Sequence, residues 1–218
     1  YLNREARFYN TVFFNGRQWP VTCKQVQFYN GGNAGVQEGQ ATTTGYMLFK
    51  RFNRSISKTS PGVASQNRPS IIFRLADFYL IYAEVANEVN PSDSRVLTYL
   101  NLVRERAGLP KVEILNPGIV GNKELQRAAI QRERQIELAT EGQRYFDVRR
   151  WMIADKDGEG RQNGYAHGMN VRGTINDTEE FNRVVETEKI VFNRKMYLQP
   201  IPDHEMRKTQ NLVQNPGW

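Results

Sequence analysis

The chain has 218 residues, with 30 Lys or Arg against 23 Asp or Glu, and its formal net charge is +7 at pH 7. Hydrophobic residues make up 39% of it and the mean hydropathy is −0.65, which describes a polar globular chain long enough to bury a real core. No stretch approaches the ~18 apolar residues that a membrane-spanning helix needs. Many of the arginines stand beside acids, which argues against the continuous basic stripe of a nucleic-acid binder.

The sequence is poorly provided with metal ligands and disulfides. The single cysteine, Cys23, cannot form an internal disulfide, and His167 and His204 are too few and too far apart for a zinc cluster. The acidic stretch over 155–160 lacks the ligand spacing of a calcium loop, so we interpret it as a solvated turn. We therefore expect no metal and no cofactor.

Short strands and polar loops are expected in the first third of the chain. Asn15-Gly16 is a dipeptide typical of tight hairpin turns, and the residues around it are aromatic or β-branched. The expected segments are a strand in Arg7–Gly16, a second strand near Val21–Tyr29, a surface loop over 30–45, a strand at Tyr46–Phe52 and a polar loop over 53–69.

A pair of helices is expected next. Apolar residues at helical spacing predict a helix over Ile72–Val89, and Asp93 is placed to cap a second helix that ends at Gly108. Two antiparallel helices of this length resemble one tetratricopeptide-type unit. Such a unit cannot bury its own apolar face. We therefore expect the chain to expose an apolar helix face.

The remaining elements follow from caps and composition. Asn122 is expected to cap a helix. Pro200 and Pro202 are expected to rigidify the turn into the last helical piece, and Asp203 to be the N-cap of that piece. In order, we expect a Pro/Gly linker over 111–121, helices over Lys123–Glu141 and 144–154, a loop over Asp155–Thr174, extended segments at Arg183–Asn193 and Tyr197–Ile201, a helix at Asp203–Thr209 and docking of Trp218.

The stretch Ile130–Trp151 mixes charge with apolar residues on one helical face. Ile130, Glu133 and Glu137 recur at three- and four-residue steps, and Arg149 and Arg150 follow on the next helix, whose buried side we expect at Tyr145, Val148 and Trp151. One interpretation is an acid/base pair or an anion site. The favoured one is a partly buried ion-pair network, because an isolated buried charge costs too much free energy.

Several stretches resemble, in the same order, the C-terminal part of the SusD/RagB family. They are RFYNTVFFNG (Arg7–Gly16), RLADFYLIYAEVAN (Arg74–Asn87), NLVRERAGLP (Asn101–Pro110), ERQIELATEGQRYFDVRRW (Glu133–Trp151) and YLQPIPDHEM with QNPGW near the end. The resemblance implies a mainly α, SusD-like fold with tetratricopeptide-type helix pairs, a loop-rich region and short β-hairpins.

The resemblance also implies a role. SusD-like proteins are surface glycan-binding lipoproteins of Bacteroidetes that work with TonB-dependent (SusC-like) transporters of the outer membrane. They are longer than this chain, so we expect a C-terminal portion whose N-terminal repeats and lipid anchor lie elsewhere. Within it we expect a loop-rich layer over 1–70, with ligand-facing loops, and a helical region over 71–218.

Binding without catalysis is the function that the residues favour. Glycosidases need two placed carboxylates, but the acids here lie mostly in Arg-rich helical sequence, so no catalytic residue is assigned. Sugars need aromatic rings with amide groups beside them. The polar loops offer Trp19, Tyr29, Asn30, Asn33, Asn163 and Tyr165 as candidate ligand contacts.

Alternatives remain open at this point. Trp19 fits equally well as a ring packed onto a strand, and Tyr29 has the same alternative. For Tyr165, packing on its own loop is the favoured interpretation. The ligand is an oligosaccharide or a peptide. The rival function is a tetratricopeptide-like scaffold that holds a protein or peptide in a helical groove. Nucleic-acid binding rests only on the basic pI and is not expected.

Overall fold

The computed structural model describes residues 1–19, 24–35, 42–50, 52, 70–156, 163–174 and 178–218. Cys23 and the expected loop over 53–69 lie outside these residues. The chain forms two compact units, one made of Tyr1–Arg144 with Gly168–Val184 and the other of Tyr145–His167 with Val185–Trp218. The boundary expected at residue 70 follows composition instead of these units, and it stays a prediction.

The first unit begins with a short helix where a strand was expected. Helix α1 (Ala6–Thr11) precedes strand β1 (Val12–Phe14), which pairs antiparallel with β2 (Tyr46–Leu48). The prediction of a strand was therefore wrong for residues 7–11, and the expected strand at Tyr46–Phe52 is only three residues long. Strand preference depends on context, and here the helix lets Arg7 reach acids far along the chain.

The turn at Asn15-Gly16 is confirmed. Gly16 has φ of 84°, and its amide donates to the carbonyl of Val26, while the Val26 amide donates to Arg17. The expected second strand does not form over residues 24–29, the described part of that segment. These residues contribute one isolated bridge, between Gln25 and Gln18. The loop expected from residue 30 is not wholly a surface loop, because Gly32 and Gly35 are buried. Beneath it lies a core of Phe13, Val26, Phe28, Tyr29, Phe49 and Phe181.

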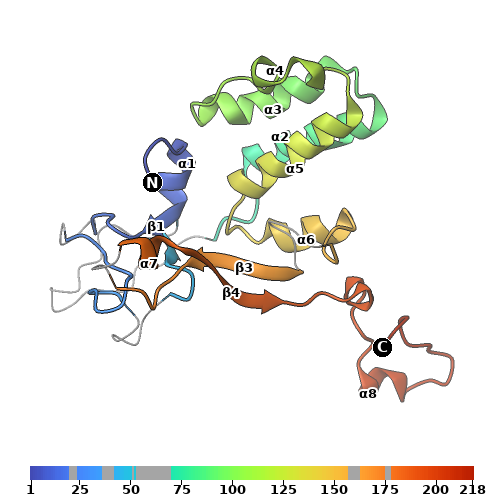
Figure 1. Ribbon diagram of the computed structural model, residues 1–218. Helices are drawn as coiled ribbons and strands as arrows, with labels where there is room; N and C mark the ends of the chain where they lie inside the picture. Colours follow the sequence, from blue (N-terminus) through green and yellow to red (C-terminus); the bar gives the residue numbers. More distant parts are fainter. Residues whose placement is uncertain (20–23, 36–41, 51, 53–69, 157–162, 175–177) are drawn as a thin grey trace. The chain divides into compact units, whose positions relative to one another are not determined.

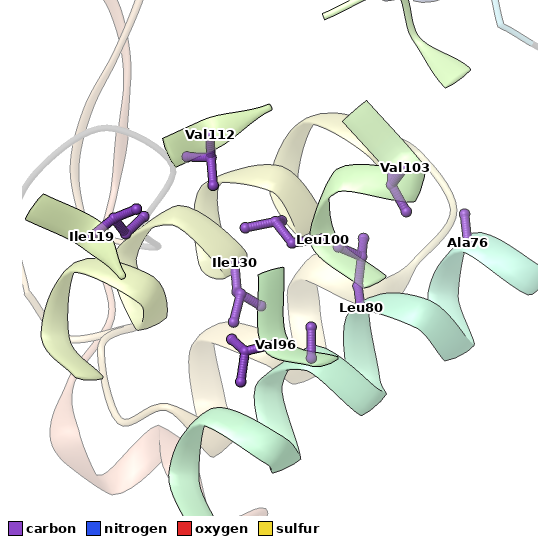
Figure 2. Close-up of a cluster of buried hydrophobic side chains, with 9 residues drawn as sticks. Ala76, Leu80, Val96, Leu100, Val103, Val112, Ile119 and Ile130 are labelled. Carbon is purple, nitrogen blue, oxygen red and sulfur yellow. The ribbon is translucent and has the colours of Figure 1, made fainter. Parts of the chain in front are cut away.

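Three helices form the second core of this unit (Figure 1): α2 (Leu75–Val89), α3 (Ser94–Arg106) and α5 (Lys123–Glu137). Leu80, Leu100 and Ile130, one from each helix, are fully buried together (Figure 2). Both expected caps are confirmed: Asp93 accepts from the Arg95 amide and Asn122 from the Leu125 amide. Helix α2 starts three residues later than expected, and α5 ends four residues earlier.

The expected linker over 111–121 is partly helical, which corrects the sequence prediction. It contains α4 (Val112–Leu115) and the 3₁₀ helix η2 (Pro117–Ile119). Val112 and Ile119 are buried in the three-helix core, and the side-chain oxygen of Asn101 accepts from the Val112 amide. Long-range burial thus imposes order that the Pro/Gly composition does not indicate.

The outer face of α2 is apolar and exposed, as expected. Its exposed residues at helical spacing are Leu75, Phe78, Ile81, Tyr82, Val85 and Val89, and Ile72 and Phe73 precede them. Phe78 and Val85 are each more than half exposed. A helix normally turns such a stripe toward a core.

The second unit contains most of α6 (Gln143–Arg150) and most of the sheet formed by β3 (Gly164–Met169) and β4 (Val184–Ile190). Strand β3 falls in an expected loop, where the sequence analysis was wrong. Helix η3 (Arg194–Tyr197) and α8 (Asp203–Met206) follow, whereas α7 (Thr178–Asn182) belongs to the first unit. The Trp218 indole donates to the carbonyls of Lys195 and Leu198, so the expected docking is confirmed.

Three expectations for the second unit need correction. Tyr145 is exposed instead of buried, although Val148 on the same helix is fully buried. The residue that precedes α8 is Pro202, so Asp203 is its first residue and not its cap. Tyr197 closes η3, so the expected extended segment there begins only after it.

Candidate functional site

Buried carboxylates of α5 meet arginines from three other segments. Glu137 accepts from Arg7 at 3.0 Å and from Arg74 at 2.6 Å, and it also pairs with Arg106. Its side chain is only 3% exposed. The pKa of Glu137 is lowered: burial alone would raise it, but hydrogen bonds from Arg74 and Arg7 hold the charged form.

Neighbouring acids extend this network. Glu133 binds Arg7 at 2.5 Å and Arg104 at 3.1 Å, and Glu141 binds Arg74 at 2.7 Å. The Lys50 ammonium completes the set, 2.6 Å from Glu141. The pKa of Glu141 is also lowered, since hydrogen bonds from Arg74 and Lys50 outweigh the effect of burial.

The predicted burial of this network is confirmed, but its partners are not the expected ones. Arg150 pairs with Asp147 of its own helix, and Arg149 lies over the rings of Tyr145 and Phe192. The cations that meet Glu133 and Glu137 come instead from α1, α3 and the entry to α2. A further pair, Arg134 to Asp77 at 2.9 Å, joins α5 to α2. The network therefore ties distant segments of the first unit together.

A cavity of about 800 Å³ opens beside the network. One side consists of residues 3–5 with α1, and the other of α5, α4 and the end of α3. Four guanidinium groups line it, those of Arg4, Arg7, Arg104 and Arg132, together with the carboxylates of Glu5 and Glu133. Sequence reasoning missed this cavity. The only local feature of the sequence that points to the cavity is the pair Arg4 and Arg7, two basic residues three positions apart.

The structure places Tyr29 in the aromatic core of the first unit and packs Trp19 against that core. The Trp19 ring is half-buried and packs edge-on against Phe13 and Phe52, with ring centroids 5.2 and 4.7 Å away. Tyr29 is 8% exposed and packs edge-on against Phe181. Both rings thus contribute packing to the same cluster.

The two asparagines of the first loop both make hydrogen bonds to backbone groups. Asn33 is exposed, but its oxygen accepts from the Gln27 amide and its nitrogen donates to Gln25. Asn30 is half-buried and its backbone amide donates to Gly173. These residues hold the shape of the loop that carries Tyr29.

The other two candidates lie in the second unit. Asn163 donates to the Asp155 carbonyl and accepts from the Phe192 amide, so both ends of its side-chain amide are bonded to backbone. Tyr165 lies on β3 with 49% of it exposed, and the Lys189 ammonium lies 5.6 Å from its ring centre. Of the six candidates, Tyr165 alone combines an aromatic ring with this much exposure. The six do not gather within a single compact unit.

The titration of the described carboxyl groups does not favour acid catalysis. Wherever a described Asp or Glu departs clearly from its usual pKa, the pKa is lowered, as at Glu88, Asp93, Glu137, Glu141 and Asp155. A general acid working near neutral pH needs the opposite shift. Within the described residues, no group of three His, Cys, Asp or Glu could hold a metal ion.

These observations define a mainly helical chain with short two-stranded sheets and a three-helix core. The model of the SusD family matches residues 1–218. The chain therefore belongs to the SusD family.

Individual relatives agree with this assignment. SusD-like protein P25 of Formosa agariphila is 44% identical over 106 residues, and SusD-like protein P2 of the same organism is 31% identical over 153 residues, which cover 49% and 68% of the chain. The chain spans only 19% and 26% of these two relatives.

Two solved structures from Bacteroides fragilis share the fold. A SusD-like protein is 28% identical and has a TM-score of 0.80, over 100% of this chain and 40% of its own. A SusD-like carbohydrate binding protein is 25% identical with a TM-score of 0.74, over 97% of this chain and 42% of its own. Among the described residues, no helix is both long and apolar enough to cross a membrane.

Proposed function

We propose that the chain is part of a surface glycan-binding protein that captures oligosaccharide for a SusC-like, TonB-dependent transporter at the outer membrane. The observation that carries the proposal is the match of the SusD family model to all 218 residues. Support comes from the fold shared with a protein described as a SusD-like carbohydrate binding protein.

The proposal is binding without bond cleavage. The clustered acids of the first unit are neutralised by arginines at 2.5 to 3.1 Å, which leaves them poorly suited to donate or accept a proton from a substrate. Sugar recognition needs no shifted pKa; it needs an accessible ring and polar neighbours.

Tyr165 is the ring that fits this role best among the six sequence-based candidates. It is half exposed on a strand, with a cation beside it that can donate to sugar hydroxyls. The other five candidates then have structural roles within their own units: Trp19, Tyr29, Asn30 and Asn33 in the first, and Asn163 in the second. A peptide-holding scaffold is not favoured, because the Bacteroides fragilis structure that is named for a ligand is a carbohydrate binding protein.

The test is retention of the purified chain on an oligosaccharide panel, by affinity electrophoresis and calorimetry. Tyr165→Ala should abolish retention of the preferred oligosaccharide and leave the melting temperature nearly unchanged, because an exposed ring contributes little to the core. Trp19→Ala is the matched aromatic control. It should lower stability by ~2–4 kcal/mol through lost packing. Retention that survives in Tyr165→Ala removes this ring from the site.

Catalysis is tested separately. The purified chain is incubated for days with the bound oligosaccharide, and new reducing ends are measured against a blank. No release is expected. Reducing ends that increase with protein concentration would overturn the non-enzymatic proposal.

A further inference from the structure

The cavity between α1 and α5 has an excess of positive charge. Its lining contains four arginines and two carboxylates. Glu133 is shared by Arg7 and Arg104, and Glu5 binds Arg7 at 2.9 Å. Two cations are therefore left over after the acids of the lining are matched.

The two remaining cations are Arg4 and Arg132. Within the described residues, neither guanidinium has an acidic partner, whereas Arg127, five residues before Arg132 on α5, binds Glu88 at 2.7 Å. The Nε atom of Arg7 is also buried in the same lining without a hydrogen-bond acceptor. Arg4 and Arg132 are exposed, so their guanidinium groups can meet an incoming anion, and the buried Nε of Arg7 is a donor still without an acceptor. Together these three groups make the cavity a place for a bound anion.

The rest of the lining is apolar. Phe8, Leu115 and Ile136 are among the residues that form it, and the Arg4 guanidinium carbon lies 5.9 Å from the Phe8 ring centre. The volume of about 800 Å³ is that of a small-ligand site. A bare inorganic ion would leave most of this surface in contact with water. The lining matches an anionic group carried by a larger body with apolar faces.

We propose that this cavity binds a uronic acid unit of an oligosaccharide, with the carboxylate held by Arg4 and Arg132 and a sugar face against the apolar lining. Guanidinium groups bind carboxylates through two parallel hydrogen bonds. A pyranose ring offers C–H faces to an apolar wall. The inference rests on the proposed function, since it names the class of glycan, and it concerns a site separate from Tyr165 on β3.

The test compares two oligosaccharides of equal length, one of glucuronic acid and one of glucose, by calorimetry with the purified chain at two salt concentrations. The acidic oligosaccharide should bind at least about tenfold more tightly at low salt, and the advantage should shrink at high salt because charged contacts are screened. Inorganic sulfate serves as a third probe and should bind far more weakly.

The variants are Arg132→Gln and Arg4→Gln, with Arg127→Gln as the matched control on the same helix as Arg132. Each removes one positive charge, but Arg127 lies outside the cavity. The two cavity variants should weaken binding of the acidic oligosaccharide about tenfold and leave the neutral one unchanged. The control should change neither by more than about twofold.

Several other results would overturn this inference, and they differ in what they imply for the proposed function. If acidic and neutral oligosaccharides bind equally, or if Arg132→Gln and Arg4→Gln behave like Arg127→Gln, this inference fails and the proposed function stands. Sulfate that binds as tightly as the acidic oligosaccharide marks an adventitious anion patch and also overturns the inference. If neither oligosaccharide binds but another member of the panel is retained, this inference alone fails. If no member of the panel is retained, both proposals fail.

Discussion

Helices usually bury apolar residues and expose charged ones. The inner face of α5 and the outer face of α2 do the reverse. Glu133, Arg134 and Glu137 on α5 are charged and at most 3% exposed. Phe78 and Val85 on α2 are apolar and 55% and 57% exposed. Both helices belong to the same three-helix core, so the contrast lies within one piece of structure.

The comparison separates two kinds of information in a helical sequence. The 3.6-residue period states which residues share a face. It does not state whether that face is buried, because burial depends on what the rest of the molecule brings to it. Buried acids on α5 are tolerable only because Arg7, Arg74, Arg104 and Arg106 come from three other segments. The face of α2 meets no comparable partner within the described residues.

The largest expected effect is at the centre of the charged face. Glu137→Ala should lower the free energy of unfolding by ~3–5 kcal/mol, because it leaves Arg7 and Arg74 buried without this acid. Chemical denaturation of the purified variant measures this. Glu88→Ala is the control, since Glu88 pairs with Lys123 and Arg127 at an exposed position, and it should cost less than ~1 kcal/mol.

A loss below ~1 kcal/mol in Glu137→Ala would mean that the charged face is effectively solvated. The charged face of α5 and the apolar face of α2 would then differ only in residue type and not in burial.

An intermediate effect on stability is expected when the pH is lowered. The pKa values of Glu137 and Glu141 are lowered in the folded state. Their contribution to stability is therefore complete above the unfolded value of about 4.3 and is lost as pH falls through the lower folded values. Denaturation midpoints measured from pH 6 to pH 3 should drop steeply in the wild-type chain.

The matched variant for this titration is Glu137→Gln, which keeps the shape but removes the ionisable group. Its midpoint should start lower at pH 6 and fall less toward pH 3 than that of the wild-type chain. Parallel curves for the two proteins would show that acid unfolding proceeds through other carboxyl groups.

Local patterns predicted local structure in this chain. Helix α3, its Asp93 cap and the Asn122 cap of α5 depend on neighbours a few residues away, and all three were predicted. Helix α1 and α4 were not, because long-range contacts decide them: Arg7 meets Glu133, 126 residues further on, and Asn101 binds the amide that starts α4. Sequence reasoning therefore placed the charged face on α5 but not its partners.

The candidate ligand contacts show the same limit. Composition identified loops rich in aromatic and amide groups, but it could not separate a ring that packs inward, such as Trp19, from one that faces outward, such as Tyr165. The cavity lies between two segments of the chain, 3–12 and 104–139, which are separated by 92 residues or more in the sequence. No window of sequence contains both of its sides.

The smallest effect on stability is expected on the apolar side of the comparison. Phe78→Gln combined with Val85→Gln should change the free energy of unfolding by no more than ~0.5 kcal/mol for each residue, because each side chain is already more than half exposed. The same change should lower the binding of a hydrophobic fluorescent dye and reduce self-association in sedimentation, since it removes the middle of the exposed stripe.

Leu80→Gln on the opposite side of α2 is the control. Leu80 is fully buried, so that variant should unfold readily and bind more dye. If the free energy of unfolding of the double variant instead falls by several kcal/mol, the outer face of α2 is packed against other residues in solution. The contrast in burial between α2 and α5 then disappears.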